Sequence, residues 1–118
     1  MNKSEYLLEI EKCEADRSKA EQIETEYKCK LDGLITNVIS YTDKSIFIDD
    51  EERVMSFSEI IQINKDYNNV FINNKMIPVI DCFDGIFIVF ILEENKWAKY
   101  STSDLIVYKK RSSLSELI

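Results

Sequence analysis

Two carboxylates, Asp81 and Asp84, flank the turn before the most apolar stretch of the chain and are the residues best suited to catalysis. Neighbouring carboxylates can have separated pKa values, so that one serves as general acid and the other as general base. Their alternative role is to accept hydrogen bonds from the turn amides. The 118 residues include no histidine and only two glycines, which excludes the usual triads, phosphate loops and dinucleotide fingerprints. We therefore favour the structural role and expect that the protein is not an enzyme.

A run of four acids, residues 49–52, offers several oxygens of the kind that Ca²⁺ binds. The run lacks the spacing and the glycine of a known calcium loop. Four like charges cannot be buried together, so the run predicts an exposed turn between short strands at residues 46–48 and 53–55. We expect no metal and no cofactor.

Three cysteines, Cys13, Cys29 and Cys82, are widely spaced and odd in number. The chain has no Cys-x-x-Cys motif and no histidine, so a zinc site is not expected. Reduced thiols are the expected state.

The stretch on which the fold depends is residues 86–92, which contains no polar residue. Seven residues are too few to cross a bilayer as a helix, and β-branched and aromatic side chains favour a strand. An unbroken apolar run predicts a central strand that is covered on both faces. Asp84 and Gly85 form a turn before it, and residues 77–80 form the preceding strand, with Pro78 at the margin of the sheet.

Helical periodicity and capping residues predict the other elements. Apolar spacing indicates helices over residues 4–14, from Ser18, and over residues 31–39, where Gly33 weakens the start. Capping boxes are expected at Ser18, Ser56 and Ser113, the second opening a middle helix to about residue 67 and the third a short C-terminal helix. Further strands are expected at residues 97–100 and 105–108. Residues 70–72 fit either a short strand or a packed loop.

Composition limits the class of protein. The length predicts a single domain over residues 1–118, and helices followed by strands predict an α+β fold with a mostly antiparallel sheet of about five or six strands. The net charge is −7, which disfavours nucleic acid as a partner and favours a basic protein, although ordinary solubility also explains it. The charged N-terminal stretch has neither a signal-peptide core nor a membrane span, so a cytoplasmic location is expected.

The order of these segments resembles the SUKH superfamily, of which many members are bacterial immunity proteins and one branch is a fungal regulator of cell-wall synthesis. The resemblance lies in residues 53–61, in Ile77 and Pro78 with the apolar residues that follow, in the Asp84–Gly85 turn, in the strand to Leu92, in Trp97 and in the Leu-rich segment 109–117. The chain departs from the family at Ile86, where members often carry an acidic or polar residue.

The resemblance implies a protein that binds and neutralises a cognate toxin domain, such as a nuclease, by stoichiometric binding. The alternative is an intracellular scaffold or regulator that is not tied to a toxin. Residues 31–100 hold 12 Asp and Glu against 6 Lys and Arg, which would suit a basic toxin. Trp97 is either a core residue or a surface anchor. The partner-binding residues predicted on these grounds are Asp49, Asp50, Glu51, Glu52, Glu93, Glu94, Trp97 and Tyr100.

Overall fold

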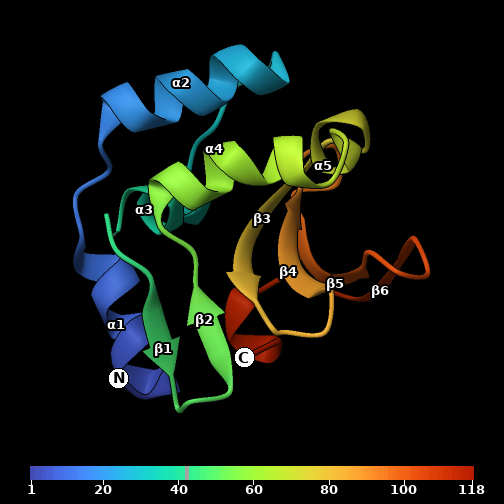
Figure 1. Cartoon of the computed structure of the whole chain (residues 1–118). Helices are drawn as coiled ribbons and strands as arrows, with labels where there is room; N and C mark the ends of the chain where they lie inside the picture. The colour runs from blue at the N-terminus through green and yellow to red at the C-terminus, as the bar shows by residue number, and fades with distance from the viewer. Residues whose placement is uncertain (42) are drawn as a thin grey trace.

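Six antiparallel strands form one sheet in which every strand pairs with its neighbour in sequence, in the order β1-β2-β3-β4-β5-β6 (Figure 1). The computed structural model describes residues 1–41 and 43–118. Its strands are β1 (Ile46–Ile48), β2 (Glu52–Val54), β3 (Met76–Asp81), β4 (Ile86–Ile91), β5 (Lys96–Ser101) and β6 (Ile106–Arg111). The predicted α+β fold with an antiparallel sheet is confirmed.

Strand β4 is interior, as its unbroken apolar sequence predicts. It pairs with β3 on one side and β5 on the other, and Phe87, Ile88, Val89 and Phe90 are all buried. Pro78 lies in a part of β3 that pairs only with β4, because β2 reaches β3 only at Ile80 and Asp81. A missing N–H is tolerated where no second strand needs it.

The described residues form five α-helices and one 3₁₀ helix: α1 (Lys3–Lys12), α2 (Arg17–Tyr27), α3 (Leu34–Ser40), α4 (Phe57–Asp66), α5 (Val70–Asn73) and η1 (Leu114–Glu116). The capping box at Ser56 is confirmed, with the Ser56 hydroxyl and the Glu59 carboxylate each accepting the other's backbone N–H.

Three local predictions are wrong. The cap of α2 is Asp16, whose carboxylate accepts the N–H groups of Ser18 and Lys19, so Ser18 lies inside the helix. Ser113 makes no capping bond and is followed by one 3₁₀ turn. Residues 70–72 are helical, because Phe71 is fully buried against the sheet and Asn64 accepts the Ile72 N–H with its side-chain oxygen. Tertiary packing overrides β propensity in so short a segment.

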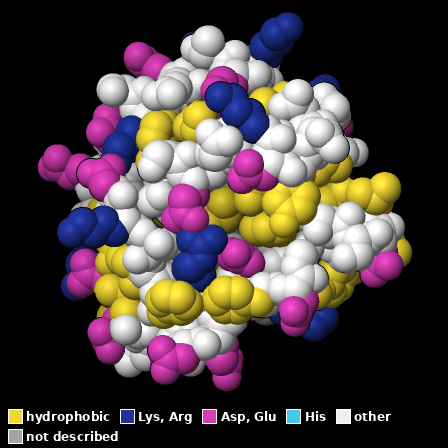
Figure 2. Space-filling model, in the orientation of Figure 1, with side chains coloured by type: hydrophobic (Ala, Val, Ile, Leu, Met, Phe, Trp, Pro, Cys, Tyr) yellow, Lys and Arg dark blue, Asp and Glu magenta, His cyan; other side chains and the backbone are white. Residues whose placement is uncertain are grey.

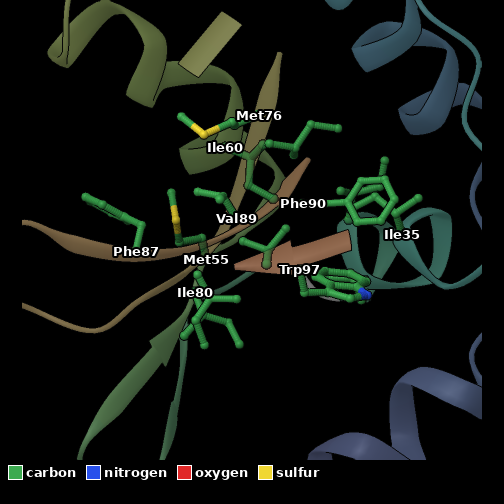
Figure 3. Close-up of a cluster of buried hydrophobic side chains, with 14 of the residues drawn as sticks. Ile35, Met55, Ile60, Met76, Ile80, Phe87, Val89, Phe90 and Trp97 are labelled. Atoms are coloured by element: carbon green, nitrogen blue, oxygen red, sulfur yellow. The ribbon is translucent and has the colours of Figure 1, made fainter. Parts of the chain in front are cut away.

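Helices cover the two faces of the sheet unequally. On one face the ring of Phe71 in α5 meets the rings of Phe87 and Tyr100 edge to face, with centroids 5.5 and 5.8 Å apart. On the other face Phe90 and Trp97 extend toward Ile35 of α3 (Figure 3). In the view of Figure 1, strands β1 and β2 lie at the front of the molecule, and no helix is drawn in front of them.

Replacement of Val89 by Asp tests the role of β4. Val89 is fully buried between Pro78 and Ala98 of the neighbouring strands. An unpaired charge there should lower the free energy of unfolding by several kcal/mol, which is of the order of total stability. Urea unfolding followed by the fluorescence of Trp97, the single tryptophan, would measure this change. The matched control is Leu105→Asp at a position that is 68% exposed, and equal stability of the two variants would contradict the assignment.

Candidate functional site

The turn between β1 and β2 displays three of the four acids of the run. Asp49 and Asp50 have positive φ values of 50° and 59°, which Asp tolerates better than most residues, and Glu51 donates its N–H to the Ile48 carbonyl. All three side chains are exposed. Lys3 Nζ lies 4.0 Å from the Glu51 carboxylate.

Glu52 does not belong to this exposed turn, and its prediction as a surface residue is wrong. It is the first residue of β2, pairs with Ile48 and is only 8% exposed. Its Oε2 atom is buried without a hydrogen-bond partner. Burial is the main cause that raises the pKa of Glu52; Lys3 and Lys99 lower it in part. The alternating pleat of β2 turns this side chain inward.

The turn between β3 and β4 is held by Asp81. Its Oδ1 atom accepts the Phe83 N–H at 2.8 Å and its Oδ2 atom accepts Arg53 Nη2 at 3.0 Å. The predicted role of Asp81 in binding a turn amide is therefore confirmed. Gly85 has a φ of 76°, and a Cβ there would lie 2.7 Å from Thr102 Oγ1, so this turn requires glycine. Asp84 is exposed.

Two exposed aromatic rings bring these turns together. Phe47 of β1 is 51% exposed and Phe83 is 39% exposed, and their rings stack with centroids 6.3 Å apart at 16°. We call the surface made by these rings and the bordering acids the Phe47–Phe83 patch: Phe47, Phe83, Asp49, Asp50, Glu51 and Asp84. Figure 2 shows exposed hydrophobic side chains over the turn ends of β1 and β2, with acidic side chains around them.

The patch continues along one row of the sheet. Phe47 pairs with Arg53, Arg53 with Asp81, and Asp81 with Phe87, and residues that face each other on neighbouring strands project from the same face. Arg53 is held between the carboxylates of Glu59 and Asp81. Burial opposes ionisation of Glu59, but hydrogen bonds from Arg53 and Ser56 lower its pKa overall. The row therefore links the patch to the helix that follows β2.

A cleft of about 230 Å³ lies beside this row, below α4. Its apolar lining includes Met55, Ile63, Tyr67 and Phe87, and Glu59 and Asp66 contribute acids to it. Figure 2 shows hydrophobic side chains in the hollow at this place. The cleft has the size and lining to accept a single apolar side chain next to negative charge.

The other predicted binding residues lie elsewhere. The register places Arg53 beside Asp81 at one end of β3 and Ile91 beside Met76 at the other, about 17 Å of strand away, so the turn that carries Glu93 and Glu94 lies at the end of the sheet opposite the acids of the β1–β2 turn. Glu93 pairs with Lys75 at 2.7 Å and Glu94 with Lys110 at 2.8 Å. The six acids do not form one patch.

Trp97 and Tyr100 are core residues. Trp97 is 4% exposed and its ring lies 4.8 Å from that of Phe90, and Tyr100 is buried against Phe71. The prediction of Trp97 and Tyr100 as exposed anchors for a partner is wrong, because both side chains are buried in the core; of the two interpretations of Trp97, the core residue is confirmed. Trp97 and Phe90 instead line a groove of about 430 Å³ between α1, α3 and the C-terminal segment.

Sequence patterns do not single out Phe47 or Phe83 as binding residues. Alternation along residues 46–48 is the one local signal that Phe47 faces away from its buried neighbour Ile48. The two rings meet because β1, β2 and β3 pair with one another. A local sequence pattern does not contain that pairing.

The cysteines and the acidic side chains of the described residues offer little further chemistry. The three cysteines are free and half-buried, and burial raises the pKa of the Cys82 thiol to about 11. Across residues 1–41 and 43–118, no three Cys, Asp or Glu side chains are arranged to hold a metal ion. Within the same residues no helix has the length and apolar character needed to cross a membrane.

Comparison with models of known protein families, with curated proteins and with solved structures finds no match for this chain. The SUKH resemblance therefore remains a prediction from the sequence motifs.

Replacement of Glu52 by Gln tests the buried carboxyl. The folded-state pKa of Glu52 is raised above its unfolded value of about 4.3, so the native state holds the proton more tightly. The contribution of Glu52 to the wild-type free energy of unfolding should therefore fall as the pH rises above about 4.3 through the raised folded pKa. Glu52→Gln should gain stability relative to wild type between pH 4 and pH 7.5, as measured by urea unfolding.

The matched control for this prediction is Glu51→Gln, which removes the same charge from an exposed neighbour. A pH-dependent gain of equal size in both variants would show that Glu52 is not the titrating group responsible.

Proposed function

We propose that this protein is a cytoplasmic immunity protein of the SUKH type, which binds a cognate toxin domain and neutralises it by stoichiometric binding without catalysis. The observation that carries the proposal is the acid excess of residues 31–100, at 12 against 6, together with the exposure of Asp49, Asp50 and Glu51 on one turn. Charge of one sign at an exposed turn attracts a partner of the opposite sign and raises its association rate. A basic nuclease domain is a partner of that kind.

We expect a secreted-toxin gene beside this chain's gene, and the function is tested with the toxin domain that such a gene encodes. Cells that express the toxin alone should die, and cells that express both proteins should survive. Titration of the purified toxin should abolish its activity at one molar equivalent of this protein. Continued toxin activity at a large excess of the protein, with no complex by gel filtration, would contradict the proposal and favour the regulator-type alternative.

The charged turn should control the association rate. The double variant Asp49→Asn with Asp50→Asn keeps side chains that tolerate positive φ and removes two charges. We expect the association rate with the toxin to fall about three- to tenfold at low salt and to depend less on salt, with a smaller change in the dissociation rate. Surface-plasmon kinetics at two salt concentrations measure both rates.

The control is Glu93→Gln with Glu94→Gln, which also removes two charges but from the opposite end of the sheet. Equal slowing by both pairs would mean that net charge alone steers association and that the β1–β2 turn has no special part in it.

Catalysis is tested at Asp84, the exposed member of the Asp81 and Asp84 pair. In the Asp84→Asn variant, protection in the co-expression assay should follow the toxin affinity of the variant, because binding and not proton transfer neutralises the toxin. Loss of protection with unchanged folding and unchanged toxin affinity would instead point to an enzyme.

A further inference from the structure

Phe47 and Phe83 contribute little to the core, although they are among the largest apolar side chains on the surface. Their rings stack on each other, 6.3 Å apart, and are 51% and 39% exposed. Folding gains most from apolar area that is removed from water, and these rings leave much of theirs exposed. Contiguous exposed apolar surface with a polar rim is typical of interaction sites.

The backbone conformation of Phe83 is a second indication that its ring belongs to an interaction site. Its φ is 68°, in the left-handed region, where Asn and Gly are favoured over aromatic residues. The β3–β4 turn would therefore be at least as stable with Asn at this position. Phe83 places an aromatic ring on the surface at a site where local backbone energetics favour a smaller polar residue.

The charges around the rings select one class of occupant. Asp49, Asp50 and Glu51 follow Phe47 closely in the chain, and Asp84 follows Phe83. The Arg53 guanidinium is already held by the carboxylates of Glu59 and Asp81, and Lys3 Nζ lies 4.0 Å from the Glu51 carboxylate. A second copy of this chain would oppose acids to acids, and a nucleic acid would oppose them to phosphates. A surface rich in Lys and Arg complements the patch.

We infer that the Phe47–Phe83 patch, continued by the cleft below α4, is the docking surface for a basic protein partner. The inference rests on the proposed function and adds the surface through which it operates. The two rings supply the apolar contact, the bordering acids pair with Lys and Arg, and the cleft lined by Met55, Tyr67 and Phe87 accepts an apolar side chain of the partner. The row from Phe47 through Arg53 and Asp81 to Phe87 joins these parts into one surface.

The test compares Phe47→Ser and Phe83→Asn with Ile106→Ser. The last is a control at a 54% exposed apolar residue on the opposite edge strand of the sheet. The probe is the purified toxin domain of the adjacent gene that the proposed function predicts, and calorimetry gives Kd. Both patch variants should weaken binding about tenfold or more, as truncation of an interface aromatic does, and the control should bind as the wild type does.

Thermal melting separates binding from folding. Phe83→Asn should melt at or above the wild-type temperature while it binds more weakly, and a purely structural role would move both quantities in the same direction. If the wild type binds the toxin and the patch variants bind it equally well, the docking surface is wrong and the proposed function stands. If the wild type does not bind, both are wrong. Dimerisation of the wild type that Phe47→Ser abolishes, seen by sedimentation velocity, would assign the patch to a second copy and overturn the inference.

Discussion

The burial of β4 on both faces is the constraint on which the rest of the structure depends. A strand with apolar side chains on both sides must have a partner strand at each edge and a covering layer on each face. Strands β3 and β5 supply the edges. Phe71 of α5 covers one face and Ile35 of α3 approaches the other. One helix before the first hairpin, α3, and one after it, α5, are therefore placed by the same strand.

The covering layer stops before the first two strands, and this leaves one face of the hairpin open. There Arg53 is a structural charge, because its guanidinium joins Glu59 at the start of α4 to Asp81 at the end of β3. The same Asp81 holds the Phe83 amide. This ion cluster therefore orders the start of α4, the end of β3 and the turn that carries the exposed ring of Phe83. Removal of one member would leave the others partly buried and unpaired.

The acidic residues divide into groups with different physical roles. Those of the β1–β2 turn are exposed, those of the β4–β5 turn are paired with lysines, and Glu52 is buried with one oxygen unpaired. A net charge of −7 therefore describes the protein poorly, because only charges that are exposed and unpaired act at a distance.

Local chemistry in the sequence determined the α+β class, the interior position of β4, the capping box at Ser56 and the turn at Gly85, because periodicity, propensity and turn geometry act over a few residues. The tertiary structure alone decided which side chains share a surface. Trp97 is core and Phe47 is exposed because strand pairing and helix cover assign the faces of the sheet. Phe83 meets Phe47 through the register of β1, β2 and β3, which is a non-local property that no window of sequence contains.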